Sequence, residues 1–258
     1  MRVSFPVLLG DAWRLWRGDW EILTAVAGIF VFLPQLAVNM LIPAGPVAPE
    51  GADAVAGSVA MLTYQAKALD WASHYVGWLA LASVLALFGQ FALVALYLSR
   101  DRPAVGSALG VAARRFPLVI LAGLIIALPL LAIATIVLLL PPLIFAILVI
   151  VFWISARTIA LAPILLAEGS VGALGAIRRS LDLTRGNTLA LAAAVMTIVL
   201  AASILGWPFS ALDFWMTTHA PNPIARAIVD AMTALVTALG SIAMALLQVT
   251  VYRRLRTR

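Results

Sequence analysis

Six long apolar stretches, separated by polar segments, dominate the chain. They lie at about 22–42, 75–98, 117–140, 143–166, 188–207 and 224–252. A helix needs roughly 20 apolar residues to cross the hydrocarbon core of a bilayer, and each stretch reaches that length. None of them alternates polar with apolar residues, as the shorter strands of a membrane barrel do. The pattern therefore predicts an all-α integral membrane protein with six transmembrane helices.

A polar segment of one kind precedes the first, third and fifth stretches. The three segments are residues 9–16, 109–116 and 174–181. Each begins with Leu-Gly and has an arginine four residues after the glycine. In the last segment, Leu174 and Ile177 share a helical face with Val171, and the arginines lie away from it, which is typical of an interfacial helix. We therefore expect three hairpins, each preceded by a cytoplasmic amphipathic interfacial helix.

Glycine and proline residues mark the expected ends of helices. Gly18 and Gly186 each follow an arginine, and each is expected to supply the left-handed residue at which a surface helix ends. Pro141 and Pro142 leave almost no loop between the third and fourth stretches, which predicts a tight hairpin.

The two longer connections on the other side of the membrane have patterns of their own. Connection 43–73 opens with Pro-Ala-Gly-Pro and is expected to begin as coil. Its second half, about 56–72, is expected to be a short helix on the membrane surface. Connection 208–223 carries aromatic residues and is expected to be a loop at the interface. Ala52 and His219 are therefore expected on the outer side.

Composition excludes several classes of protein. Of the 258 residues, 64% are apolar and 11% are charged, and the mean hydropathy is +1.09. A soluble globule of this size cannot bury so much apolar surface and cover itself with so little charge. The net charge is +6, but the composition still argues against a nucleic-acid-binding protein, a soluble enzyme and a disordered chain.

The basic residues are unevenly distributed about the predicted spans. Of the 17 lysines and arginines, 14 lie on the side that holds both termini, and the opposite connections carry only Lys67 and Arg226. By the positive-inside rule, both termini are cytoplasmic. The segment before the first span mixes charge with tryptophan and is not expected to be a cleaved signal peptide.

Arginines of the three amphipathic segments are the candidates for binding anionic headgroups of the inner leaflet. They are Arg14, Arg17, Arg114, Arg115, Arg178, Arg179 and Arg185. One interpretation is that these arginines only anchor and orient the hairpins. The other is that they recognise specific lipids.

Four polar residues fall inside the predicted spans or at their ends, where such residues are rare and often functional. They are Arg157, Gln90, Asp230 and Glu168. Arg157 is expected to extend toward the inner interface, or to pair with Glu168 or a neighbouring helix, and the alternative is a role in a pore or in headgroup binding. One interpretation is that Gln90 forms an interhelical hydrogen bond and that Asp230 lies at the outer interface. The alternative is that they belong to a path for protons or cations.

Known catalytic patterns are missing from the sequence. It has no cysteine, and its two histidines, His74 and His219, fall at the outer edges of spans. No zinc-protease, serine-hydrolase, Walker or dinucleotide-binding motif is present. We therefore expect no catalytic residue, no metal site and no cofactor.

Three short stretches resemble a known family. Residues 162–168 read APILLAE, 179–187 read RSLDLTRGN, and 251–256 read VYRRLR. These patterns are similar to those of the membrane domain family of glycerophosphoryl diester phosphodiesterase and its YciC-like bacterial inner-membrane relatives. The resemblance implies a multi-pass protein of the bacterial inner membrane. In relatives that hydrolyse glycerophosphodiesters, catalysis belongs to a separate soluble domain, so the resemblance implies no catalytic residue here.

These observations favour a non-enzymatic membrane scaffold that interacts with lipids or with a protein partner. The anionic inner leaflet is the expected lipid partner, a second copy of the chain is one possible protein partner, and no nucleic acid is expected to bind. The alternative is a small-molecule or lipid transporter with a polar path near Arg157, and a third hypothesis is an intramembrane enzyme.

Overall fold

The computed structural model describes residues 4–43, 45–49, 57–98, 105–138, 144–169, 171–219 and 222–256, and this part of the chain is helical with no strand. The helices in order are α1 (Phe5–Gly18), α2 (Trp20–Ala27), the π-helix η1 (Gly28–Phe32), α3 (Leu33–Leu41), α4 (Val59–Leu98), α5 (Val105–Leu138), α6 (Ile144–Thr158), α7 (Leu161–Ala167), α8 (Ala173–Leu183), α9 (Thr188–His219) and α10 (Pro223–Arg256).

Six segments of the described chain are long and apolar enough to cross a membrane. They are Trp20–Leu41, Val59–Leu98, Val105–Ile133, Ile147–Ala167, Thr188–Met216 and Pro223–Arg256. The predicted all-α membrane fold with six spanning segments is therefore confirmed.

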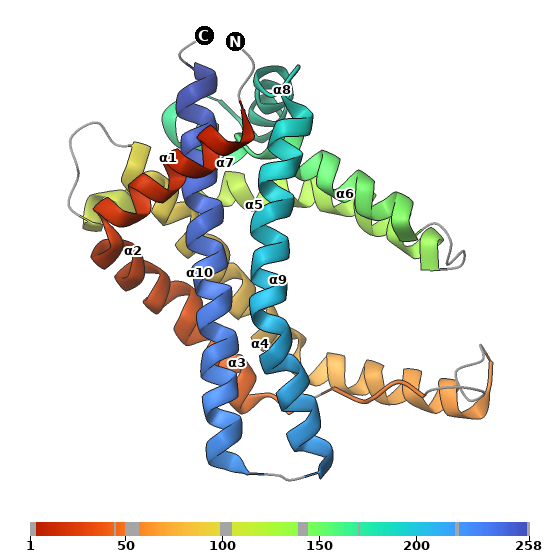
Figure 1. Cartoon of the computed structure of the whole chain (residues 1–258). Helices are drawn as coiled ribbons and strands as arrows, with labels where there is room; N and C mark the ends of the chain where they lie inside the picture. The colour runs from red at the N-terminus through yellow and green to blue at the C-terminus, as the bar shows by residue number, and fades with distance from the viewer. Residues whose placement is uncertain are drawn as a thin grey trace.

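Helices α9 and α10 form the long axis of the molecule (Figure 1). They run antiparallel, and α1 and α8 lie at the end of this pair where α10 finishes. Along α10, Leu246 packs into a core with Leu23 of α2 and Leu93 of α4. A second cluster joins Leu247 of α10 to Leu8 of α1, among others. Since lipid is as apolar as these side chains, close packing rather than escape from water holds such helices together.

Helix α4 approaches η1 closely at Gly89. A methyl group on Gly89 would lie 2.5 Å from the Cβ atom of Phe30 in η1. The wide turn of η1 comes just before Pro34, which has no N–H to donate to Phe30. Leu33 donates instead to the carbonyl of Gly28, five residues back, as in a π-helix. This turn therefore sets the path of α3 against α4.

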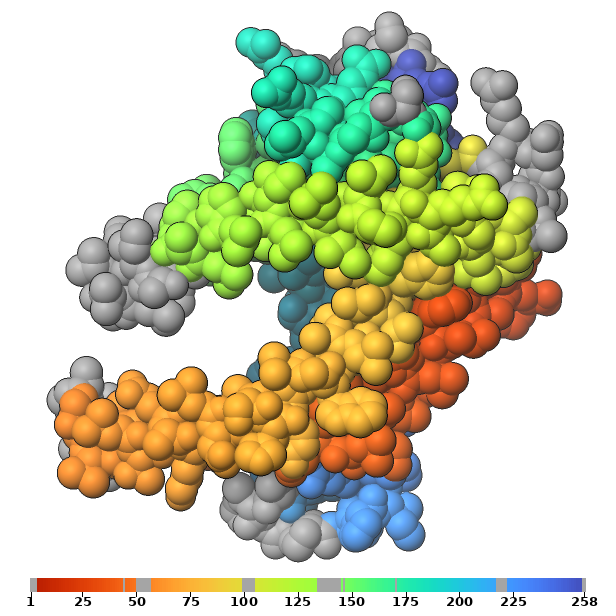
Figure 2. All heavy atoms as spheres, turned by 180° about the vertical axis from the view of Figure 1, so that it is seen from behind, coloured from red at the N-terminus to blue at the C-terminus, as the bar shows by residue number. Residues whose placement is uncertain are grey.

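Two apolar arms extend sideways from the bundle (Figures 1 and 2). The N-terminal half of α4 forms one arm, α5 and α6 form the other, and Figure 2 shows an open space between them. On α5, Leu121, Leu124, Leu128 and Leu131 are 49–63% exposed. Apolar side chains on all sides of a helix are typical of a membrane-embedded segment, so lipid is expected to cover these arms.

The connection at residues 43–73 differs from the prediction. The surface helix at 56–72 and the span at 75–98 are one helix, because α4 continues for 40 residues from Val59. No glycine or proline falls between residues 59 and 76, so nothing ends the helix there. Ala52 lies outside the described residues.

Two of the three expected surface helices are separate elements. Helices α1 and α8 precede spans as predicted, but residues 109–116 belong to α5, which continues through Pro117 and Pro129. The prediction of three separate surface helices is therefore wrong for the middle segment.

The two glycines expected to end surface helices behave differently. Gly186 has a φ of +83°, as predicted for the stop after α8. Gly18 is not among the described glycines with positive φ, so that expectation is wrong. The chain turns instead at Asp19, whose φ of −132° is outside the helical range, and its amide donates to the carbonyl of Leu15.

The fourth span is divided into two helices. Instead of one helix at 143–166, α6 ends at Thr158 and α7 begins at Leu161. Pro163 cannot donate a hydrogen bond to the carbonyl of Ile159, so the regular helix breaks at that point. The hairpin expected at residues 141–142 lies outside the described residues.

The last outer connection is shorter than expected. Residues 208–223 were expected to form a loop, but α9 continues through Pro208 to His219, and α10 begins at Pro223. The prediction of a loop is therefore wrong for most of this segment, in which Pro208 is accommodated inside the helix.

Candidate functional site

Arginine-rich segments that are distant in sequence meet at one end of the bundle. Arg254 of α10 pairs with Asp11 of α1. Arg115 of α5 donates to the carbonyl of Gly169, in the connection between α7 and α8. We call this end, formed by α1, α8, the start of α5 and the last turn of α10, the arginine end (Figure 1).

Asp11 makes two ion pairs, one of which joins the first helix to the last. Its carboxylate contacts Arg14, one turn further along α1, and Arg254 at the end of α10. Burial by itself raises the pKa of Asp11, but hydrogen bonds and charge attraction from the two arginines outweigh it and hold the pKa below its ordinary value. Asp11 is therefore ionised at neutral pH and stabilises the arginine end.

Tyr97 fastens the end of α4 to the corner between α1 and α2. Its hydroxyl lies 3.1 Å from a carboxylate oxygen of Asp19, to which it donates a hydrogen bond. Arg253 of α10 donates to the backbone carbonyl of Tyr97. This contact chain fixes α1 relative to the spans.

The predicted headgroup-binding arginines fall into two groups. Arg14, Arg115 and Arg179 make contacts within the protein, with Asp11, Gly169 and Glu168 respectively. The other four are exposed and have no acidic partner among the residues that the structure describes. They are Arg17, Arg114, Arg178 and Arg185.

Helix α8 packs into the bundle through its small residues. Ala173, Ala176 and Ser180 are buried, whereas Leu174 is 60% exposed. The apolar face predicted from the sequence contacts the bundle in part, because Val171 and Ile177 are half-buried and pack against the core. Leu174, from the same face, is left exposed one turn before Arg178.

Arg157 stands at the break between α6 and α7. It lies in the last turn of α6, and its backbone carbonyl accepts hydrogen bonds from the hydroxyls of Ser180 (2.9 Å) and Thr184 (3.2 Å) of α8. Both hydroxyl residues are fully buried. Two hydroxyls four residues apart on the small-residue face of α8 were the available signal for this contact, and the sequence analysis did not assign them that role.

The side chain of Arg157 does not pair with Glu168. Its guanidinium lies over the ring of Trp153, 5.9 Å from the centroid, and its Nε is buried with no hydrogen-bond partner. Glu168 pairs instead with Arg179 (Nε to Oε2, 3.8 Å) and accepts a hydrogen bond from Tyr252. The expected Arg157–Glu168 pair is therefore wrong, because α8 provides the partner of Glu168.

The candidate polar residues of the spans do not converge. Asp230 lies near the start of α10, at the end away from the arginine end, and Gln90 is half-buried on α4. Arg157 contacts α8 at the opposite end. His74, on the arm formed by α4, contacts the backbone carbonyl of Asp70. The structure thus separates the residues of the expected transport path.

Gln248 is a polar residue that the sequence analysis missed. It lies on α10 and lines a cavity of about 390 Å³ with Ser155 and Thr158 of α6 and with residues of α9. Its Oε1 atom is buried and has no hydrogen-bond partner. In the sequence, the signal for this residue was a single amide side chain inside an apolar span.

In the described part of the chain, no three His, Cys, Asp or Glu side chains are close enough together to hold a metal ion. The sequence matches no family model, and no curated protein or solved structure is a match to the chain.

Proposed function

We propose that this chain is a non-enzymatic, multi-pass protein of a bacterial inner membrane that binds anionic lipids and so organises the membrane or a partner protein. In this proposal both termini and the arginine end face the cytoplasm, as the distribution of positive charge favours. The residue pattern shared with the membrane domain family of glycerophosphoryl diester phosphodiesterase supports the bacterial location.

One observation supports lipid binding most directly. Arg17, Arg114 and Arg178 come from three helices and Arg185 from the turn after α8; all four lie exposed at one end of the bundle and have no acidic partner among the described residues. Each such cation near an anionic bilayer contributes about 1 kcal/mol of attraction. The exposed Leu174 beside them offers an apolar contact at the depth of the headgroups.

The test measures how lipid charge affects the stability of the full chain in detergent micelles. Phosphatidylglycerol, compared with phosphatidylcholine of the same acyl chains, should raise the unfolding midpoint, because a ligand that binds only the folded state stabilises it. The triple variant Arg17→Gln, Arg178→Gln and Arg185→Gln should lose most of that increase. Lys67→Gln, which removes an exposed cation from the arm of α4, should keep it.

A triple variant that is stabilised as much as the wild type would contradict lipid binding by these arginines. The proposal would also be wrong if the wild type showed no preference for the anionic lipid, a result that does not depend on any variant.

Transport is the second candidate function, and the unpaired polar atoms of the spans favour it. Gln248 and the hydroxyls of α6 line a cavity of about 390 Å³ between α6, α9 and α10. Arg157 also lies on α6, although it does not line that cavity, and it has a buried Nε with no partner. An arginine of this kind is suited to a phosphate or carboxylate, which it binds in a planar two-point geometry.

Proteoliposomes loaded with labelled inorganic phosphate test this candidate. Efflux above that of empty liposomes, lowered by Arg157→Lys at an unchanged unfolding midpoint, would favour transport because lysine lacks the planar geometry. Equal efflux with and without the protein would favour the scaffold.

A further inference from the structure

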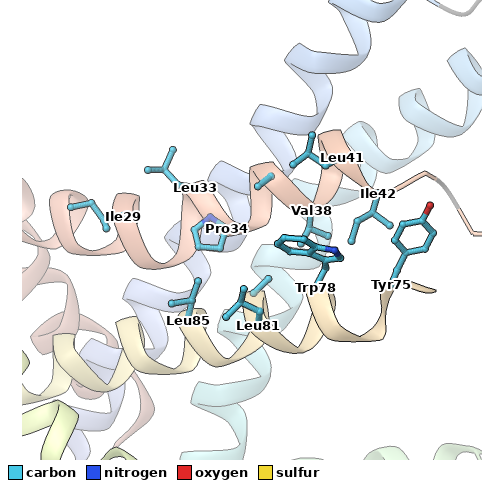
Figure 3. A pocket seen from close by; sticks show the side chains of 12 residues that line it. Ile29, Leu33, Pro34, Val38, Leu41, Ile42, Tyr75, Trp78, Leu81 and Leu85 are labelled. Carbon is cyan, nitrogen blue, oxygen red and sulfur yellow. The ribbon is translucent and has the colours of Figure 1, made fainter. Parts of the chain in front are cut away.

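An apolar crevice opens between α3 and α4, at the end of the bundle away from the arginine end (Figure 3). Its volume is about 500 Å³, within the range of ligand-binding pockets, and every residue that lines it is apolar or aromatic. Leu33 and Val38 of α3 face Trp78, Leu81 and Leu85 of α4 across it. Such a crevice can hold an acyl chain, and no charged residue lines it.

A polar cavity of about 280 Å³ adjoins the crevice and shares Val38 and Ile42 with it. Its charged lining comes from the facing ends of α9 and α10: Asp213, Arg226 and Asp230. The two cavities together are therefore amphiphilic, with an apolar part and a charged part joined at the end of α3.

Within the described residues, the carboxyl group of Asp230 makes no direct hydrogen bond or ion pair, although the charges of Arg226 and Asp213 both act on it. Asp230 is only 9% exposed, and it lines the cavity. Arg226, one turn before it, is paired with Asp213 (Nε to Oδ1, 3.5 Å). A buried carboxylate without a partner is unfavourable, and a bound cation would relieve that cost.

The backbone around Asp230 is held in place from α3. The side-chain amide of Asn39 donates to the carbonyl of Asp230 (3.3 Å), and Gln35 donates to the Oδ1 of Asn39 (2.9 Å). Helix α3, which forms one wall of the crevice, is thus tied to the residue that lines the polar cavity.

The charges of this site select among lipid headgroups. Two carboxyl groups and one guanidinium leave one net negative charge, which attracts an ammonium group and disfavours a purely anionic headgroup. A primary ammonium can donate hydrogen bonds to Asp230, whereas a quaternary ammonium cannot. The guanidinium of Arg226 retains N–H groups that can bind the phosphate of the same molecule.

We propose that this end of the bundle binds one phospholipid with a primary amine in its headgroup. The ammonium is held by Asp230, the phosphate by Arg226, and an acyl chain occupies the crevice between α3 and α4. The site lies at the opposite end from the arginine end and differs from it in charge. An experiment can therefore contradict lipid binding at one end without contradicting it at the other.

The test titrates the purified full chain with phosphatidylethanolamine, phosphatidylcholine or phosphatidylglycerol of identical acyl chains and counts bound lipid by native mass spectrometry. Phosphatidylethanolamine should bind about tenfold more tightly than phosphatidylcholine, the ratio expected for one charged hydrogen bond. Asp230→Asn should abolish that preference. Asp182→Asn, an exposed carboxylate on α8, is the matched control and should retain it. Phosphatidylglycerol, which the arginine end attracts, should bind the wild type and Asp230→Asn equally.

A second pair of variants tests the apolar half of the site. Ala82→Phe fills the crevice from α4 and should weaken the binding of phosphatidylethanolamine and phosphatidylcholine alike. Ala66→Phe, at an exposed position outside the crevice on the same helix, should leave binding unchanged. Phosphoethanolamine, the headgroup without chains, should bind far more weakly than the lipid.

Equal affinity of the wild type for phosphatidylethanolamine and phosphatidylcholine would overturn the proposal, and this readout needs no variant to fold. A preference that survives Asp230→Asn would also overturn it. Tight binding of phosphoethanolamine would show that the crevice is not part of the site.

Discussion

The hydroxyl of Ser180 donates a 2.9 Å hydrogen bond to the backbone carbonyl of Arg157, and so α8 closes the end of α6. The helix has broken at this point, which leaves the carbonyl without its usual partner in the next turn. The adjacent hydroxyl of Thr184 reaches the same oxygen (3.2 Å). Helix α8 is thus fastened by its buried hydroxyls, and its arginines are left for contacts elsewhere.

Removal of both hydroxyls should destabilise the protein. In the double variant Ser180→Ala and Thr184→Val, the carbonyl of Arg157 stays buried without these donors, which should lower the free energy of unfolding by about 1–3 kcal/mol. The measurement is thermal or chemical unfolding in detergent. Ser83→Ala on α4, which is exposed and bonds only within its own helix, should change stability by less than about 0.5 kcal/mol. Equal losses of stability in the double variant and in Ser83→Ala would argue that these hydroxyls do not cap α6.

A methyl group at position 89 should disturb the contact between α4 and η1. In Gly89→Ala the added carbon meets the Cβ of Phe30, which cannot rotate away, so the helices must separate. We expect a loss of about 1–3 kcal/mol in the free energy of unfolding, as for overpacked cores. Gly123→Ala on α5, where nothing lies within 4 Å, should be neutral or slightly stabilising. A neutral Gly89→Ala variant would contradict this packing.

Stability should depend on pH through Asp11. Because its pKa is lowered in the folded protein, its contribution is present above the unfolded pKa of about 3.9 and is lost as the pH falls through the folded value. Asp11→Asn should therefore unfold at a lower midpoint than the wild type at pH 7, and the difference should shrink as the pH falls below about 4. Unfolding midpoints from pH 7 to pH 3 measure this. Asp70→Asn, whose carboxylate is mostly exposed, should not show the same convergence.

Topology can be tested by labelling, because the chain has no cysteine of its own. Gln65→Cys on the arm of α4 and Asp182→Cys on α8 are exposed at opposite ends of the molecule. A membrane-impermeant maleimide added to spheroplasts should label the first variant and not the second, because the positive-inside rule places α8 in the cytoplasm. The reverse pattern would require the opposite orientation.

The sequence by itself determined the fold class and the approximate spans. Whether a segment enters a bilayer depends on the summed hydropathy of about 20 consecutive residues, which is a local property. Glycine makes the left-handed stop at Gly186 sterically free, but the same pattern at Gly18 did not form a stop, so the residue type alone does not decide it. Pro163 removes a helical hydrogen bond where the fourth span breaks, whereas α5 and α9 continue through their prolines.

Only the tertiary structure decided which polar residues are free to bind a ligand. Arg179 and Arg178 are neighbours in sequence, yet only Arg179 finds Glu168. Asp230 gains its place beside an apolar crevice because Asn39, 191 residues away in sequence, donates to its carbonyl. Hydrogen bonds and ion pairs act over a few ångströms through space, so their partners follow from how the helices pack and not from the order of residues along the chain.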